Sequence, residues 1–270
     1  MSRRFLLIDT SALAYRAWHT TGGLSHGGVE TGVAFGVFRE VLKLEAEFVI
    51  RRIVWCFDGG CECRRAVSPE YKAARSDRGD GADREAVTGQ IKELYRRWLP
   101  AVGFRNLLRR RGFEADDVIA AVVGGLPPAD EAVIVSGDHD LWQLLRPGVS
   151  VYAPVKGRLT TDESFRAEWG LEPRDWAKVL AIAGCPGDGV RGIDGVGEKS
   201  AAQWLAGRLD PKGKRWAAIR DGWQRIGAND RLVRLPFPGV GRFDLADDAD
   251  VVDWRPVLKE LGMRSLLEGF

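Results

Sequence analysis

Three carboxylates fall within four positions of the segment Gly112 to Ala120, at the start of an apolar run. They are Glu114, Asp116 and Asp117. Carboxylates this close together repel one another unless a positive charge lies between them. One explanation is a helix start, where acidic residues complement the positive end of the helix macrodipole. The other is a divalent-metal site, which requires further carboxylates at the ends of other elements.

Further acidic residues follow short apolar runs elsewhere in the chain. The runs are Phe5 to Ile8 before Asp9, Ile53 to Phe57 before Asp58, and Ala132 to Ser136 before Asp138 and Asp140. Such runs are typical of buried parallel strands, and the ligands of parallel sheets bind beyond the carboxyl ends of the strands. Each aspartate alone could be a turn former or a helix cap. Together they favour a metal site at one edge of a sheet.

The elements that would position these acids alternate along the chain. Gly32 to Phe48 has apolar residues at helical spacing and lies between the first two strands, and a fourth strand is expected at Val149 to Tyr152. This alternation predicts an α/β fold with a mostly parallel central sheet flanked by helices. The later segments predict a hairpin and three helices: the hairpin from Tyr152 to Leu159, and helices over Asp162 to Trp169, Pro173 to Ala183 and Trp254 to Leu267.

A basic segment lies between Asp58 and Glu114. Residues 64–111 contain 13 Lys and Arg against 6 Asp and Glu, although the whole chain has a net charge of only +2. A helix is predicted from Arg84 to about Arg111. Such a charge run is usually the solvated face of a helix. Its place between two candidate metal ligands instead favours a basic element that holds a polyanion over the site.

A glycine-rich stretch follows from Gly184 to Ala201. A Walker loop is excluded because Glu198 separates Gly197 from Lys199, and a dinucleotide fingerprint is excluded because no strand precedes the stretch. The pattern fits a helix, a glycine-rich turn and a second helix. Backbone N–H groups at such a helix start can hold a nucleic-acid phosphate. A simple connection between two helices is the alternative.

Composition bounds the class of protein. The 270 residues (29.8 kDa) are enough for one large domain or two unequal ones, and 45% hydrophobic with 29% charged residues is ordinary for a globular protein. No apolar run approaches membrane-spanning length, so we expect a cytoplasmic protein without a membrane partner. The four cysteines, Cys56, Cys61, Cys63 and Cys185, form no zinc pattern and are expected to be free thiols.

These motifs together resemble those of the 5′ nuclease family of flap endonucleases and 5′-3′ exonucleases, in its stand-alone phage-type or bacterial form. The matching segments run in the family's order across roughly the first 210 residues: Leu7 to Asp9, Cys56 to Asp58, Tyr71 to Arg75, Gly112 to Ala120, Ser136 to Leu145 and Gly184 to Ala202. The resemblance implies a PIN-like nuclease core over residues 1–170, with a helical arch at about 76–104. It also implies a helical part over 171–270, with a helix-three-turn-helix at about 173–207.

The resemblance implies two Mg²⁺ or Mn²⁺ ions. By analogy, Asp9, Asp58, Glu114 and Asp116 surround the first and Asp138, Asp140 and Asp188 the second, with Asp116 reaching both and Asp117 acting from outside or through water. Lys72 and Arg75 are the implied catalytic cations at the base of the arch. Gly192, Gly195, Gly197, Lys199 and Ser200 are the implied DNA contacts, with a K⁺ ion at that turn. Cys185 departs from the family, since many members carry a further aspartate there.

The implied function is structure-specific hydrolysis of DNA phosphodiester bonds, from 5′ ends and at 5′ flaps, by a two-metal mechanism that leaves 5′-phosphates. The implied setting is DNA replication and repair, with a separate DNA polymerase and single-strand-binding protein as partners of a monomer. A catalytically inactive or weak DNA-binding protein with the same fold is the alternative. An RNA-directed nuclease of PIN type is a third reading, and the glycine-rich turn from Gly192 to Gly197 counts against it.

Overall fold

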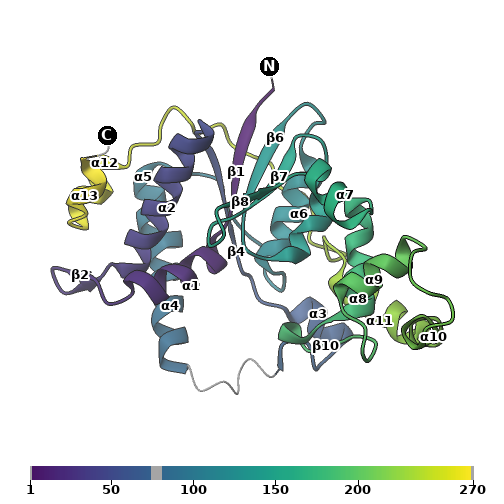
Figure 1. Cartoon of the computed structure of the whole chain (residues 1–270). Coiled ribbons are helices and arrows are strands. Elements are labelled where there is room, and N and C mark those ends of the chain that lie inside the picture. Colours follow the sequence, from purple (N-terminus) through teal and green to yellow (C-terminus); the bar gives the residue numbers. More distant parts are fainter. Residues whose placement is uncertain (1, 74–80, 269–270) are drawn as a thin grey trace.

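A six-stranded sheet forms the centre of the computed structural model, which describes residues 2–73 and 81–268 (Figure 1). Its strands are, in spatial order, β5 (Leu107–Arg109), β4 (Arg52–Phe57), β1 (Arg4–Asp9), β6 (Glu131–Val135), β7 (Val149–Ala153) and β8 (Arg158–Thr160). All neighbours are parallel except β8, which forms the expected hairpin with β7. The predicted α/β fold with a mostly parallel sheet is therefore confirmed.

The apolar runs become buried strands because both faces of the sheet are covered. Along β1, Leu6 and Ile8 enter one hydrophobic core, and Phe5 and Leu7 enter the other. All four side chains are at most 2% exposed. A continuous apolar sequence is what a strand needs when neither face meets water.

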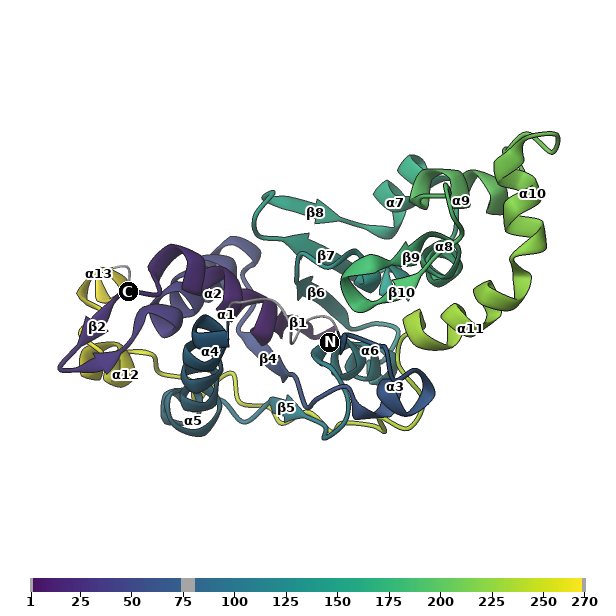
Figure 2. The same cartoon turned by 90° about the horizontal axis from the view of Figure 1, so that it is seen from below.

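One face of the sheet is covered by the helices at the left of Figure 2. They are α1 (Thr10–Thr21), α2 (Gly32–Phe48), α4 (Gly81–Glu93), the π-helical turn η2 (Leu94–Trp98), α5 (Leu99–Val102), α12 (Arg255–Glu260) and α13 (Arg264–Leu267). A short hairpin of β2 (Ser25–His26) and β3 (Val29–Glu30) joins α1 to α2. Helix α2 has the bounds that the sequence predicted.

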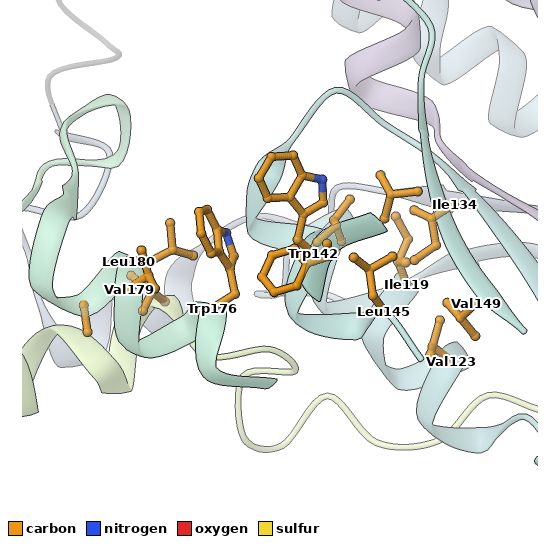
Figure 3. Close-up of a cluster of buried hydrophobic side chains, with 14 of the residues drawn as sticks. Ile119, Val123, Ile134, Trp142, Leu145, Val149, Trp176, Val179 and Leu180 are labelled. Atoms are coloured by element: carbon orange, nitrogen blue, oxygen red, sulfur yellow. The ribbon is translucent and has the colours of Figure 1, made fainter. Parts of the chain in front are cut away.

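The other face carries the elements that lead toward the glycine-rich stretch. They are α3 (Glu62–Val67), α6 (Ala115–Gly125), the 3₁₀ turns η3 (His139–Leu144) and η4 (Pro173–Asp175), α7 (Asp162–Trp169), α8 (Trp176–Ala183), α9 (Glu198–Leu205), α10 (Lys214–Asp221) and α11 (Trp223–Val233). Figure 3 shows how Trp142 and Trp176 join the core under α6 to that around α8. Residues on both sides of position 170 share this core. The domain boundary predicted at that position stays a prediction.

Two helix predictions were wrong in extent. The helix expected to reach Arg111 ends at Val102, because Gly103 adopts φ 110° and its N–H caps the carbonyls of Leu99 and Pro100. Leu107 and Leu108 then extend the sheet as β5. The helix expected over 254–267 is two short helices, α12 and α13, separated at Gly262, whose φ is 66°.

The topology brings the carboxyl ends of three strands together. β1 lies between β4 and β6, and the chain crosses from β5 through α6 back over the sheet to β6. The strand order therefore reverses beside β1, which is where ligands of such sheets bind. Among the described residues, no helix is long and apolar enough to span a membrane.

Candidate active site at the carboxyl edge of the sheet

Asp9 and Asp58 lie at the carboxyl ends of neighbouring strands. Asp9 is 5% exposed; one of its carboxylate oxygens accepts from the Ala12 N–H (3.0 Å), which caps α1, and the other from the Ser136 hydroxyl (2.9 Å). Asp58 is exposed and accepts from the Ala115 N–H at the start of α6 (2.9 Å). Each acid accepts a hydrogen bond from the start of a helix, as the helix-cap alternative predicted. Both nevertheless lie at the same edge of the sheet.

Asp138 and Asp140 follow β6 on the other side of β1. Asp138 caps η3 by accepting from the Asp140 N–H (2.8 Å), and Ser136 links the two strand ends because its hydroxyl accepts from the Asp138 N–H (3.2 Å). Ser136 thus contacts Asp9 and Asp138 at once. No sequence pattern singled out this serine as a site residue.

Glu114 is held by three donors. It is 8% exposed, and its side chain accepts from the Tyr71 hydroxyl (2.8 Å), from Arg64 (3.2 Å) and from the Lys72 ammonium. Lys72 also lies 3.6 Å from Asp188, and the Tyr71 hydroxyl oxygen lies 3.3 Å from the same aspartate. Tyr71 and Lys72 therefore join a carboxylate of α6 to one from the glycine-rich stretch.

Asp117 has a different environment from its neighbours. It is fully buried, forms a two-pronged ion pair with Arg64, and accepts from the backbone N–H groups of Phe237 (2.8 Å) and Glu114 (3.3 Å). Arg64 is 3% exposed and also donates to the Leu232 carbonyl (2.8 Å). These contacts favour a structural role for Asp117, because both of its oxygens already have strong partners.

Asp116 interacts with acids from both implied metal-binding groups: Asp9 and Glu114 from the first, and Asp138 from the second. Burial raises its pKa well above the usual range, and the charges of Asp138, Asp9 and Glu114 add to this, while Lys72 opposes it. Asp116 thus interacts with the acid that ends β1, with the acid that precedes η3 and with the N-cap of its own helix α6. The family resemblance implies that this carboxylate reaches both metal ions, and that assignment stays a prediction.

The other buried acids show the same excess of negative charge. Burial, Asp58 and Asp138 raise the pKa of Asp9 to about 7. Burial, Asp138 and Asp188 raise the pKa of Asp140 to about 8, against the opposing charges of Lys72 and Arg64. These carboxylates resist ionisation because too little positive charge lies near them. Their oxygens are hard donors, so the group suits a divalent cation such as Mg²⁺.

The acids line one edge without forming a closed cage. Within residues 2–73 and 81–268, no three His, Cys, Asp or Glu side chains converge closely enough to hold a metal ion as they stand. The oxygens of Glu114 and Asp9 are occupied by protein donors instead. Metal binding would require some of these contacts to exchange.

The basic segment reaches this edge from α4. A cavity of about 330 Å³ is lined by Asp58, Glu114, Lys72 and Arg65 together with Arg84 of α4. Arg75, the second expected catalytic cation, lies outside the described residues, as do positions 76–80 of the expected arch. Positions 81–102 form one helical run through α4, η2 and α5.

Cys185 lies beside Asp138, Asp140 and Asp188, the acids that the family resemblance implies for the second metal ion. Burial raises the pKa of its thiol, and Asp140, Asp188 and Asp138 raise it further. The side chain is therefore a neutral thiol at physiological pH. It occupies the place where the family resemblance implies a carboxylate, so this group has one negative charge fewer.

The glycine-rich stretch begins with a small hairpin that the sequence did not predict. β9 (Gly184–Cys185), the 3₁₀ turn η5 (Pro186–Asp188) and β10 (Val190–Arg191) separate α8 from the turn at 192–197, and α9 follows. The turn lines a cavity of about 560 Å³.

The glycines of this turn serve different purposes. A Cβ on Gly192 would lie 2.0 Å from the Ala183 carbonyl oxygen, so only glycine fits there. Gly195 adopts φ 75°, and among the described residues no atom beyond the adjoining residues lies within 4 Å of a Cβ built on Gly195 or Gly197. Gly197 is the N-cap of α9, whose first turn carries the exposed Lys199 and the half-buried Ser200.

Comparison with known proteins identifies the family. Residues 4–170 match the family described as 5′-3′ exonuclease, N-terminal resolvase-like domain. The chain is also 35% identical over 210 residues to DNA polymerase I of Mycobacterium tuberculosis, which covers 74% of this chain. The chain belongs to the 5′-3′ exonuclease family. It spans 22% of that polymerase, and 32% of the thermostable DNA polymerase I of Thermus thermophilus, to which it is 31% identical over 98% of its own length.

Solved structures agree on the fold of this family member. The 5′-exonuclease of phage T5, solved with divalent zinc ions, superposes with a TM-score of 0.73 at 22% identity, covering 98% of this chain and 99% of the other. The catalytic core of Rad2 in complex with DNA substrate gives a TM-score of 0.53 at 16% identity, covering 96% and 88%. These structures confirm the fold expected from the sequence, and the match over residues 4–170 confirms the expected family.

Proposed function

We propose that this chain is a divalent-metal-dependent 5′ nuclease that hydrolyses DNA phosphodiester bonds from 5′ ends and at 5′ flaps. The observation that carries the proposal is the gathering of carboxylates at the ends of β1 and β4, at the start of α6 and in η3 and η5, with Lys72 among them. Membership of the 5′-3′ exonuclease family supports the direction of attack. The T5 5′-exonuclease, whose fold the chain shares, binds divalent metal ions.

We assign the carboxylates to two metal ions, as the motifs suggested. Asp9, Asp58, Glu114 and Asp116 would hold the first Mg²⁺ or Mn²⁺, and Asp138, Asp140 and Asp188 the second, with Asp116 shared. Bound metal ions in such sites lower the pKa of a water molecule and stabilise the charge on the leaving oxygen. The pKa shifts of Asp9, Asp116 and Asp140 support this assignment because added positive charge would relieve them.

Lys72 and Arg75 would supply positive charge at the scissile phosphate. In the structure the Lys72 ammonium pairs with Glu114 and approaches Asp188, so its role at the phosphate requires that pair to open. Preorganised donors of this kind are worth roughly 10²-fold or more in rate. Positions 76–104 would form the arch over a single-stranded 5′ end, and Arg84 on the cavity wall supports that placement.

The turn at 192–197 would hold the duplex part of the substrate. Backbone N–H groups at the start of α9, with Lys199 and Ser200, would contact one phosphate backbone, and carbonyl oxygens of the turn would hold a K⁺ ion. The open surroundings of Gly195 and Gly197 support close approach by a backbone. This part corresponds to the proposed helix-three-turn-helix at about 173–207.

The proposed products carry 5′-phosphates, and the proposed setting is DNA replication and repair. The relatives join a homologous segment to the rest of DNA polymerase I, so a polymerase that acts with this chain fits the proposal. A monomer and a single-strand-binding partner remain parts of the same proposal. A DNA-binding protein without turnover is the rival.

A 5′-flap duplex with a labelled 5′ end tests the proposal. We expect Mg²⁺-dependent release of short 5′-phosphorylated products, which stops when a chelator is added. Asp58→Asn should abolish turnover, whereas Asp247→Asn, at a remote and exposed acid, should not. Binding that persists without any cleavage by the intact chain would establish the rival, because salt-dependent binding alone is common to both.

Metal binding can be measured without turnover. If the acids draw together around metal ions, Mn²⁺ should raise the melting temperature of the protein, with about 2.7 kcal/mol of stabilisation at 100 times the dissociation constant. Asp58→Asn should reduce this shift. An unchanged melting temperature across the titration would contradict the assigned metal site.

A further inference from the structure

A basic surface extends beyond the proposed helix-three-turn-helix onto α10. Lys212 precedes this helix, and Lys214 and Arg215 form its start; all three side chains are exposed. The nearest acidic residues in the sequence are Asp210, whose carboxylate accepts from the backbone N–H of Lys212, and Asp221, which pairs with Arg220 at the other end of the helix. A net positive face therefore remains at the start of α10.

This face is continuous with the start of α9. Arg215 donates to the Ser200 hydroxyl (3.4 Å), so α10 begins beside the first turn of α9, where Lys199 is also exposed. Figure 2 shows α9 and α10 next to each other at the end of the molecule farthest from α2 and α12. The cations of the two helices thus form one surface rather than two separate patches.

The position of α10 is fixed on the glycine-rich turn. The junction between α10 and α11 packs so closely that a Cβ on Gly222 would lie 2.3 Å from a side-chain carbon of Ile193. The buried Asn229 of α11 donates to the carbonyls of Ala181 and Arg191 (both 2.9 Å), and Arg225 donates to the Gly192 carbonyl (3.2 Å). These contacts attach α11, and through the junction at Gly222 also α10, to the turn.

We propose that Lys212, Lys214 and Arg215 form a second phosphate-contact element for duplex DNA, next to the one at the turn. This inference rests on the proposed function for the identity of the ligand. A basic surface rigidly attached to a phosphate-binding turn fits the same polyanion along its length, because successive phosphates lie on one continuous backbone. The chain would then contact a longer stretch of duplex than the turn alone can reach.

The test compares two triple variants in duplex binding without turnover, with Ca²⁺ in place of Mg²⁺. The first variant combines Lys212→Ala, Lys214→Ala and Arg215→Ala. The control combines Arg39→Ala, Lys43→Ala and Lys259→Ala, which removes three exposed charges from α2 and α12. Fluorescence anisotropy gives the dissociation constant of a flap duplex between 50 and 300 mM salt.

We expect the first variant to lower the slope of log K against log salt by about 2–3, since each phosphate contact contributes about 0.9. Its affinity should fall by about tenfold or more, and the control should keep the wild-type slope. Shortening the duplex until it ends at the turn should remove the difference between wild type and the first variant. A wild-type slope in the first variant, or an equal loss in the control, would overturn the proposal.

Cleavage separates this proposal from the proposed function. At saturating substrate, the first variant should cleave at the wild-type rate, because Lys212, Lys214 and Arg215 are not part of the carboxylate site at the strand ends. If the intact chain binds the duplex but does not cut it, the nuclease proposal fails while the salt slopes still decide the role of α10. If it cuts normally and the slopes coincide, only the role of α10 fails.

Discussion

The carboxylate edge and the glycine-rich turn differ in how their polar groups are satisfied. At the edge, Glu114 and Asp117 are bound by side-chain and backbone donors from distant parts of the chain. At the turn, Gly195 and Gly197 border open space, and Lys199 is exposed. Glu114 and Asp117 thus tie the edge to the folded core, whereas the turn is a surface that a ligand can approach.

This difference predicts how substitutions should behave. A change at the edge should alter stability together with activity, because the same hydrogen bonds hold the elements and orient the acids. A change on the open side of the turn should alter DNA binding alone. Four predictions test this contrast, in order of decreasing effect.

Asp116→Asn should have the largest effect on activity. The charges of Asp9, Glu114 and Asp138 all act on Asp116, and metal ions supply several kcal/mol of transition-state stabilisation, so we expect cleavage to fall by about 10³-fold or more. Single-turnover cleavage of the flap duplex measures this. Duplex affinity should stay within about twofold, because the turn is unchanged. Full activity in this variant would remove Asp116 from the metal site.

Arg64→Met should have the largest effect on stability. It leaves the fully buried Asp117 without its ion-pair partner, a change that costs about 3–5 kcal/mol. Urea unfolding measures the loss. Adding Asp117→Leu should restore part of it, since the buried charge disappears, although the contacts of Asp117 with backbone N–H groups are also lost. A single variant as stable as wild type would show that Arg64 does not hold the edge together.

The sequence made the main strands predictable because each is a run of apolar residues ended by a polar one. β5 was missed because its apolar signal is two leucines, followed by three arginines. Helix α2 was predicted in full because a long amphipathic pattern constrains both of its ends. Short elements next to glycine depend on backbone conformations that apolar spacing does not encode.

The acids of the site were predictable for the same reason, since strand ends meet at one edge in any parallel sheet. Their partners were not. Arg64 is one of 13 cations in its segment, and it lies 53 positions from Asp117, so no local pattern distinguishes it. The same holds for Tyr71 and Asp188, which are 117 positions apart. Such pairs join segments that only the folded chain brings together: α3 with α6 through Arg64 and Asp117, and Tyr71 with η5 through Asp188.

Cys185→Asp should have a moderate effect that is confined to the edge. The thiol lies among Asp138, Asp140 and Asp188, so a carboxylate there adds a hard ligand to the second group of acids. We expect the Mg²⁺ concentration for half-maximal cleavage to fall by up to about tenfold, and the metal-free protein to melt at a lower temperature because like charges are added. Cys185→Ser is the control without charge. An unchanged Mg²⁺ curve would show that position 185 does not affect the second ion.

Gly192→Ala and Gly197→Ala compare the two sides of the turn itself. At Gly192 a methyl group would meet the Ala183 carbonyl, so we expect a loss of about 1–3 kcal/mol in unfolding free energy. At Gly197 the space is open and φ is −99°, so the loss of N-cap preference should cost no more than about 1 kcal/mol.

Gly197→Ala should instead weaken duplex binding by about three- to tenfold, because the methyl group stands where a phosphate would approach the start of α9. Anisotropy at fixed salt measures the affinity, and thermal melting shows that the fold is intact. The opposite pattern, with a destabilised Gly197→Ala variant that binds DNA normally, would mean that the turn is a plain connection between helices. The contrast between a structural edge and a binding surface would then fail at the turn.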